Sequence, residues 1–544
     1  MNPKNILSVL LLAAVTALPS HADVKVLTER YNDARTGANL FEHELNSRNV
    51  NVSSFGKLFS HAVSGAVQAQ ILYVPHLLIP GKGLHNVIFV PTMNDVLYAF
   101  DADDNQGSNA NPLWVRDFTD PAHGITAVPI TDIVVTNGPG NIVGNVGIES
   151  TPVIDRRSST MYVLVRTKEN GAYFQRLHAV ALETGADLPG GVVTIQGKVG
   201  ALTFDPLIQN QRSALALARG QVFIAWASNE DANPYHGWVM SYDATTLAQT
   251  GVFCTSPTGK EGGIWMAGWA PAVDPEGNVY YISGNGDWNG VDNFGQTFLK
   301  FCSHGLQLLD WFTPADWAAM NAHDFDVGAS GGILIPGTHL LVAGGKSGIF
   351  YLLDTRHLGH LTAGDTGAVQ ELTINSLVPP HGSIKEGPVY WNRHGQKGPW
   401  LYVWADNDYL RAFRFNGQTF DPTPVSQSTF TAPTGYTTGG SLALSADGQR
   451  PGSGILWASI PFNGDGNHGT TPGVLRAFDA DDLTKELWNS EQNSARDSLG
   501  DWPKFSPPTV ANGKVYEPSF SGQISVYGLL RPSAHDGGDG NDRH

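Results

Sequence analysis

The amino-acid sequence predicts an all-β protein, an eight-bladed β-propeller of four-stranded antiparallel blades. Its 544 residues include 62 Gly and 33 Pro but only 15% charged residues, which is typical of short apolar strands joined by many turns. One unit of about 61 residues recurs eight times along the chain, as it does in repeat architectures. The last unit is one strand short, and an unassigned β-run precedes the first. Together these three observations predict a closed ring.

Each repeat contains two apolar runs separated by a turn, followed by a small-aromatic-Asp signature and often a Trp. The clearest copy joins the run at 86–91 to Asp95–Asp103, and Val474–Asp481 nearly repeats it. Four strands of about five or six residues with short turns fit the length of the repeat. One apolar anchor marks each copy in turn: Phe100, Val180, Tyr242, Phe301, Leu353, Phe413, Phe478 and Tyr527.

A run of small residues opens several of the predicted blades. Examples are 150–155, 269–274, 387–390 and 506–510. Small side chains suit the inner strand of a blade because the inner strands crowd together beside the axis. The other strands alternate apolar positions, which predicts that both faces of each blade pack against neighbouring blades.

The two ends of the chain predict how the ring closes. The last repeat supplies strands only at about 506–511, 514–520 and 522–530, so we expect residues 55–63 to form the outer strand of the last blade. The propeller then spans 55–530, with a strap at 23–54 and a solvated tail at 531–544. An open solenoid of the same repeats is the weaker alternative, because neither end shows a polar capping repeat.

The first 22 residues have the features of a secretory signal peptide. Lys4 is followed by an apolar run at 6–18, and Ala22 ends a small-residue cleavage site. We therefore expect a protein that is secreted or periplasmic after cleavage near Ala22. No later apolar run is long enough to predict a membrane span. The net charge of −17, without a basic cluster, argues against nucleic acid as a partner.

The chain contains two cysteines, Cys254 and Cys302. They fall on consecutive blades of the predicted ring, and secretion would place them in an oxidising compartment. A disulfide between the two blades and a pair of buried thiols are both compatible with these positions.

Two segments carry a resemblance to a known family. The segment Trp269–Trp288, which ends in a Gly-Asn-Gly-Asp-Trp turn, resembles the fourth blade of the pyrroloquinoline-quinone (PQQ) alcohol dehydrogenases. The opening Tyr31–Asn39 resembles uncharacterised secreted members of the wider set of PQQ-like repeat proteins, which also includes non-catalytic assembly factors. The resemblance implies the propeller fold, with PQQ and Ca²⁺ as cofactors if the chain is a dehydrogenase.

Single residues carry the dehydrogenase part of this resemblance. Asn285 and Glu169 match the positions that bind Ca²⁺ in the dehydrogenases, and Lys346 matches the basic residue that contacts the quinone oxygens. Trp265 lies two positions from the place of the Trp that covers the quinone ring. Asn285, Glu169 and Lys346 also lie in turn sequences, which explain these residue types without any ligand.

The sequence departs from the dehydrogenase pattern at the catalytic base. Phe301 occupies the position of the base, and a Phe cannot accept a proton. No vicinal Cys pair exists to lie against a quinone ring. The polar cluster His323, Asp324 and Asp326 offers Asp326 as a substitute base, although the same groups could simply hold a loop between blades.

Loops that lead into inner strands should line one mouth of the channel. Asp326 lies in such a loop, and Glu149, Trp265, Glu386 and Lys504 occupy similar places. Two functions are therefore open. The favoured one is a binding or scaffold propeller whose mouth takes a protein, a glycan or a small-molecule ligand, and the alternative is a PQQ- and calcium-dependent alcohol or sugar dehydrogenase with a substituted base.

Overall fold

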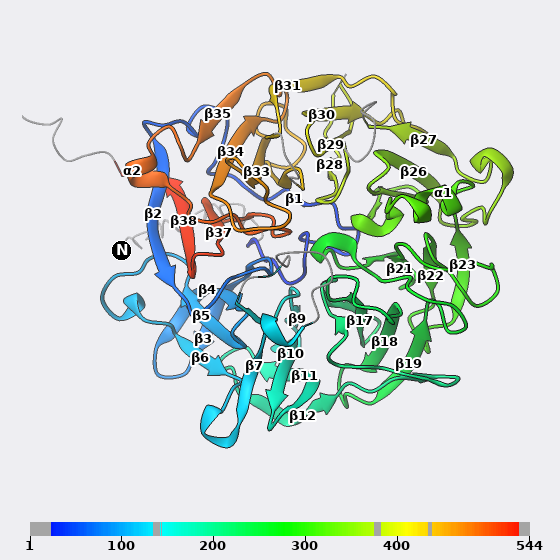
Figure 1. Cartoon of the computed structure of the whole chain (residues 1–544). Helices are drawn as coiled ribbons and strands as arrows, with labels where there is room; N and C mark the ends of the chain where they lie inside the picture. Colours follow the sequence, from blue (N-terminus) through cyan, green and yellow to red (C-terminus); the bar gives the residue numbers. More distant parts are fainter. Residues whose placement is uncertain are drawn as a thin grey trace, which may run out of the picture.

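The computed structural model describes residues 23–133, 142, 144–374, 382–395, 397–433 and 438–531. They form a closed ring of eight blades around a central axis (Figure 1), which confirms the predicted fold. The predicted signal peptide, residues 1–22, lies outside the described residues, and so does the predicted tail apart from residue 531.

Each blade is an antiparallel meander. Its strands follow one another from the axis to the outside of the ring, as β9 to β12 show in Figure 1. The first four blades are β3 (Leu72–Ile79), β4 (Gly83–Pro91), β5 (Val96–Asp101) and β6 (Trp114–Asp117); β9 (Val153–Asp155), β10 (Thr160–Glu169), β11 (Ala172–Ala181) and β12 (Asp187–Thr194); β16 (Ala216–Ala218), β17 (Gln221–Ser228), β18 (Trp238–Asp243) and β19 (Gln249–Cys254); and β20 (Ala272–Val273), β21 (Val279–Ile282), β22 (Phe298–Phe301) and β23 (Leu308–Phe312).

The second half of the ring repeats this arrangement. Blades 5 to 8 are β24 (Ile333–Leu334), β25 (Leu340–Gly344), β26 (Ile349–Asp354) and β27 (Gln370–Thr373); β28 (Val389–Trp391), β29 (Trp400–Trp404), β30 (Tyr409–Arg414) and β31 (Ser426–Thr431); β32 (Ser441–Ser445), β33 (Ile455–Pro461), β34 (Gly473–Asp479) and β35 (Glu486–Asn489); and β36 (Thr509–Ala511), β37 (Lys514–Pro518) and β38 (Gln523–Leu529) with β2 (Phe55–Ala62).

A few short elements decorate the blades. Strands β7 (Ile125–Pro129) and β8 (Asn145–Val146) extend blade 2, β15 (Gln209–Asn210) pairs with β17, and β13 (Lys198–Val199) pairs with β14 (Leu202–Thr203). The described residues contain two α-helices, α1 (Trp317–Ala322) and α2 (Ser494–Asp497). Both are far shorter than a membrane crossing requires.

Strand β2 closes the ring, as the sequence predicts. It pairs antiparallel with β38 from Phe55 opposite Leu529 to Ala62 opposite Gln523, so the first strand of the ring completes the last blade. The Phe55 ring lies 5.0 Å from that of Trp488 and 5.3 Å from that of Trp457, so it also packs the last blade against the seventh. This pairing removes two open sheet edges.

The apolar anchors of the repeats form the core between blades. All eight are almost completely buried, and the ring of Phe478, for example, packs 5.8 Å from that of Trp404 in the preceding blade. Burying a large apolar side chain contributes about 1.5–3 kcal/mol, so the eightfold repetition stabilises every interface of the ring. Phe301, which the family resemblance places at the base position, is one of these anchors, and its ring lies 4.8 Å from that of Phe253.

The two cysteines are free thiols in the structure, so the disulfide alternative is wrong. The alternation of side chains along β19 explains this. Phe253 packs towards blade 4, whereas Cys254 is buried with Trp226 and Trp238 in the cluster between blades 2 and 3. The thiol of Cys254 therefore faces away from Cys302, and burial raises its pKa to about 11.

The N-terminal segment lies inside the ring. Its backbone bonds in turn to the inner strands of blades 1, 2, 4, 5 and 6, through Val26, Leu27, Asp33, Ala34 and Thr36. Strand β1 (Ala38–Asn39) then pairs parallel with β32 of blade 7. In Figure 1 this segment is the dark blue chain at the centre of the propeller. Residues 26–39, part of the predicted strap, therefore form a hub inside the ring.

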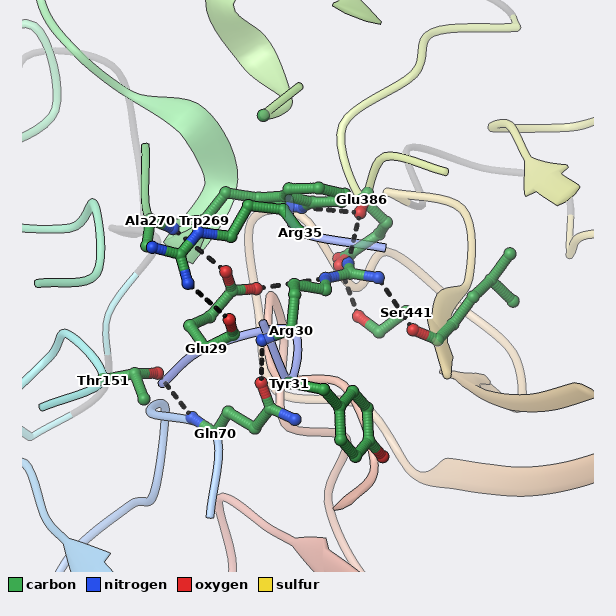
Figure 2. Close-up of polar contacts among 12 residues, drawn as sticks. Glu29, Arg30, Tyr31, Arg35, Gln70, Thr151, Trp269, Ala270, Glu386 and Ser441 are labelled. Carbon is green, nitrogen blue, oxygen red and sulfur yellow. Dashed lines mark hydrogen bonds and ion pairs between the residues drawn. The ribbon is translucent and has the colours of Figure 1, made fainter. Parts of the chain in front are cut away.

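Charged side chains anchor this hub (Figure 2). Arg30 donates hydrogen bonds to the carbonyl oxygens of Leu442 and Glu386, both at 2.8 Å, and to Glu29 at 3.0 Å, while its guanidinium stacks 3.9 Å above the ring of Trp269. Arg35 donates to the carbonyl oxygen of Pro271 at 2.9 Å. The hub thus places one buried ion pair, Arg30 with Glu29, and a second hydrogen-bonded arginine at the centre of the ring.

Candidate functional site

A cavity of about 250 Å³ opens where loops from blades 3 to 8 converge on the axis. Two kinds of segment build it, the loops that lead into inner strands and the turns between the second and third strands of a blade. Its lining residues are Arg212, Glu230, Asp231, Trp265, Ala267, Asp324, Asp326, Ala329, Lys346, Lys385, Asn467, His468 and Phe505. The structure therefore brings the predicted residues Asp326, Lys346 and Trp265 together in one cavity.

Lys346 and Asp326 form the centre of one wall. The Lys346 Nζ atom lies 2.6 Å from Asp326 Oδ2 and 2.8 Å from Asp324 Oδ1. The two segments can approach this closely because of glycines. A Cβ atom at Gly345 would lie 2.0 Å from the carbonyl oxygen of Asp326, and one at Gly284 would lie 2.1 Å from Asp326 Oδ1.

Both oxygens of the buried Asp326 carboxylate are bonded. Oδ2 pairs with Lys346, and Oδ1 accepts a hydrogen bond from the Asn285 backbone N–H at 2.7 Å. Burial raises the pKa of Asp326, while Lys346 acts in the opposite direction. Burial alone would lower the pKa of Lys346, but the two carboxylates outweigh it and raise that pKa. The ammonium therefore stays charged at neutral pH, and Asp326 is held as part of an ion pair.

Asn285 lies beside this pair, and Glu169 does not. The Asn285 side chain donates to Asp324 Oδ1 at 2.6 Å, and its own oxygen accepts from Gln296 Nε2, also at 2.6 Å. Glu169 ends β10 and is paired with Arg176 on β11, outside the cavity lining. The structure thus brings Asn285 together with Asp326 and Lys346 and leaves Glu169 in a separate ion pair.

The residues present do not fit a calcium ion. Calcium prefers six to eight oxygen ligands, several of them carboxylate oxygens. The oxygens of Asn285 and Glu169 accept hydrogen bonds from protein donors, and an ammonium occupies the space between Asp324 and Asp326. In the described part of the chain, no group of three or more His, Cys, Asp or Glu side chains could hold a metal.

Three further residues predicted for the mouth have structural partners. Glu386 accepts hydrogen bonds from Ser441, Thr438 and the Phe505 backbone, and so ties blades 6, 7 and 8 together. Glu149 accepts from Gln68 and Asn210. Lys504 donates to the carbonyl oxygen of Asn467. Burial, with the nearby charge of Arg212, lowers the pKa of Lys504 to about 7.

Two cations of the cavity were missed by the sequence reasoning. The Arg212 guanidinium stacks 3.9 Å above the Phe505 ring and makes no hydrogen bond to any residue that the structure describes, its nearest acid being Glu149 at 3.7 Å. Lys385 makes neither an ion pair nor a hydrogen bond with the described residues, and burial lowers its pKa. The sequence could have indicated both, because each lies four residues before an inner strand, and the predicted residue Lys504 lies close before the inner strand β36.

Unusual backbone conformations gather around the cavity. Five of its lining residues that are not glycine have φ in the left-handed region, namely Glu230 (51°), Asp231 (53°), Ala267 (43°), Asp324 (59°) and Phe505 (65°). Such conformations cost of order 1–3 kcal/mol each and cluster at ligand sites. Burial, together with the charge of Asp326, also raises the pKa of Asp231 to about 6. The strained backbone conformations and the shifted pKa of Asp231 thus both occur at this cavity.

Comparisons with known proteins agree with this fold. No protein-family model matches the sequence. No curated protein matches it either. Among solved structures, a europium-containing methanol dehydrogenase superimposes with a TM-score of 0.55 at 13% identity, over 93% of this chain and 98% of its own. The quinohemoprotein alcohol dehydrogenase ADHIIG from Pseudomonas putida HK5 gives 0.53 at 14% identity, over 95% of this chain and 82% of its own. The chain therefore has the PQQ-like propeller fold of the quinoprotein alcohol and methanol dehydrogenases, and at these identities the likeness extends to the fold alone.

Proposed function

We propose that this PQQ-like propeller is a binding protein that takes a small anionic ligand in its axial cavity. The observation that carries the proposal is the pair of cations, Arg212 and Lys385, which line the cavity without a hydrogen bond to any described residue. A cation held away from water without hydrogen bonds is costly, so an anion that bonds to both would be favoured.

The rest of the lining supports the same ligand. Trp265 and Phe505 give the cavity aromatic walls that suit a flat body. The carboxylates of Asp324 and Asp326 are already neutralised in part by Lys346, and Asp231 accepts a hydrogen bond from the Tyr235 hydroxyl at 3.2 Å. A molecule with a flat ring and one or more carboxylate groups would use both parts of the lining.

The dehydrogenase alternative has less support. Asp326, its substitute base, has both oxygens bonded, and Phe301 lies in the core. The calcium ligands implied by the resemblance are occupied by protein donors. PQQ, a flat tricarboxylate, nevertheless remains a suitable probe for the cavity.

Calorimetric titration with PQQ and with citrate, in the presence of EDTA, tests the proposal. We expect saturable binding of at least one of them at one molecule per chain. Arg212→Gln and Lys385→Gln should each weaken it by about tenfold or more, because each removes a charged hydrogen bond. Arg157→Gln is the matched control, since the Arg157 side chain is 92% exposed and lies outside the cavity.

Two results would contradict the proposal. One is the absence of saturable binding by either probe to the folded protein, and the other is binding that both cavity variants leave unchanged. PQQ binding that requires added Ca²⁺ would instead favour the dehydrogenase.

We also propose that the protein works outside the cytoplasm. The residues that favour this are Lys4, the apolar run at 6–18 and Ala22. Mass spectrometry of the exported protein should find Asp23 as the first residue, and a chain that keeps Met1 inside the cell would contradict export.

A further inference from the structure

Every oxygen that the family resemblance assigns to a metal ligand has a protein donor in this chain. Asn285 Oδ1 accepts from Gln296 Nε2 at 2.6 Å, and Glu169 Oε2 accepts from Arg176 at 3.0 Å. The carboxylate of Asp326, which lies beside Asn285 but not beside Glu169, is paired with Lys346 at 2.6 Å. Protein donors thus satisfy these oxygens, two of them at the mouth and one, Arg176, in the separate ion pair of Glu169.

Among these donors, the Lys346 ammonium lies where a bound cation would be expected. It lies 2.6 Å and 2.8 Å from oxygens of two different carboxylates, Asp326 and Asp324. Calcium–oxygen distances are about 2.3–2.6 Å, so the ammonium occupies nearly the place that a metal bridging these carboxylates would take. Asn285 holds the arrangement in place, because its backbone N–H bonds to Asp326 and its side chain to Asp324.

We propose that the Lys346 ammonium is a built-in replacement for a divalent cation at this mouth, so that the protein binds its axial ligand without a metal. The inference rests on the proposed function, since it concerns the same cavity, but it makes a separate claim about cations. The chain itself supplies the positive charge that organises Asp324 and Asp326, and that charge is present at neutral pH in every molecule.

One consequence is a latent metal site. Removing the ammonium leaves two carboxylates facing a shared vacancy, with Gln296 and Asn285 fixing the loops around them. The negative charges of Asp324 and Asp326 would then repel each other, and a divalent or trivalent cation bound between them would relieve this repulsion. The unaltered chain should therefore bind such a cation poorly at the mouth, whereas a variant without the Lys346 charge should gain affinity.

Titration with Ca²⁺ by calorimetry and with Tb³⁺ by Trp-sensitised luminescence tests this, because Trp265 lines the same cavity. We expect no binding of either ion at the mouth of the unaltered protein. Lys346→Met should gain at least about tenfold in affinity for both ions, and adding Asp324→Asn should remove the gain. Lys346→Arg keeps the charge and should gain nothing.

Lys168 provides a matched control. Its ammonium also lies 2.6 Å from a carboxylate, that of Asp132, but this pair lies outside the cavity lining. Lys168→Met should therefore not create the luminescent site.

Two outcomes would overturn the inference. The first is Ca²⁺ binding to the unaltered protein that Asp324→Asn or Asp326→Asn abolishes, and this needs no Lys346 variant to fold. The second is a Lys346→Met protein with an unchanged melting curve and no gain in affinity. The titrations with PQQ and citrate contain EDTA and so do not depend on bound metal. If neither ligand binds, the proposed function is wrong, but the conclusion about cation binding is unaffected.

Discussion

At the scale of single residues, the neighbours of a carboxylate decide what it can do. Glu169 and Asp326 both lie at the end of a strand or loop on the same side of the ring. Glu169 is held by Arg176, seven positions along the same hairpin, whereas Asp326 is held by Lys346 at the edge of an open cavity. The residue type alone could not distinguish a local ion pair from a cavity wall.

Glu517 offers a prediction about pH. It is fully buried in β37, and burial raises its pKa to about 8 although the Ser459 hydroxyl nearby acts in the opposite direction. The unfolded chain releases this proton near pH 4.5 while the folded chain keeps it, so Glu517 lowers stability increasingly as the pH rises from about 4.5 to 8. Glu517→Gln should stabilise the protein by up to about 4 kcal/mol at pH 8 and by little at pH 4.5.

Urea unfolding of both proteins at the two pH values measures this effect. Glu491→Gln is the control, because the Glu491 side chain is only partly buried. An equal change in stability at both pH values would show that Glu517 is ionised in the folded protein.

The sequence predicted the cavity residues that depend on local position. Asp326 and Trp265 were found because they precede inner strands, and Lys346 because it lies in the turn of a matching hairpin. Arg212 and Lys385 satisfy the same rule and were overlooked. The pairing of Asn285 with Gln296 could not be predicted, because it depends on how the long connection between β21 and β22 folds back on itself.

At the scale of elements, two N-terminal segments stabilise the ring in different ways. Strand β2 completes the last blade, and this pairing was predictable from the count of strands. The segment from Val26 to Asn39 was predicted only as a strap. Its path through the centre of the ring depends on hydrogen bonds to strands hundreds of residues away, such as the bond from Leu444 to Gly37, which no local pattern encodes.

The hub yields a prediction at this scale. Glu29 accepts hydrogen bonds from Arg30 and from the backbone of Ala270, and all three groups are buried. Arg30→Met removes the cation, leaves Glu29 with one partner fewer and takes one hydrogen bond from each of two carbonyl oxygens, so it should destabilise the protein by about 3–5 kcal/mol. Glu29→Gln combined with Arg30→Met should lose less than the sum of the single changes, because no unpaired charge remains.

Equilibrium unfolding in urea of the two single variants and the double variant measures this coupling. Strictly additive losses would mean that Glu29 and Arg30 do not stabilise each other. Arg48→Met, at an exposed position on the same N-terminal segment, should change stability by less than about 0.5 kcal/mol.

At the scale of the whole molecule, the ring converts a linear repeat into a single site. Each blade contributes at most a few residues to the cavity, and Arg212 and Phe505, which stack on each other, are almost 300 residues apart in the sequence. The fold was predictable because the repeat is periodic and its anchors are apolar. The chemistry of the cavity was less predictable, because it depends on contacts between blades, and the repeat pattern does not specify these contacts.

The last prediction concerns the cooperativity of this ring. Removing residues 52–63 takes away β2 and exposes an unpaired edge on β38, the strand that would then end the last blade. Because each blade packs only on its two neighbours, an opened ring should lose stability as a whole, and we expect one unfolding transition at a lower temperature.

Phe55→Ala should act in the same direction and cost about 3–5 kcal/mol, since Phe55 is fully buried against Trp457 and Trp488. Leu58→Ala on the same strand is the control, because Leu58 is 38% exposed. Calorimetry decides the matter: if the truncated protein melted like the full chain, β2 would be an accessory strand and the ring would close without it.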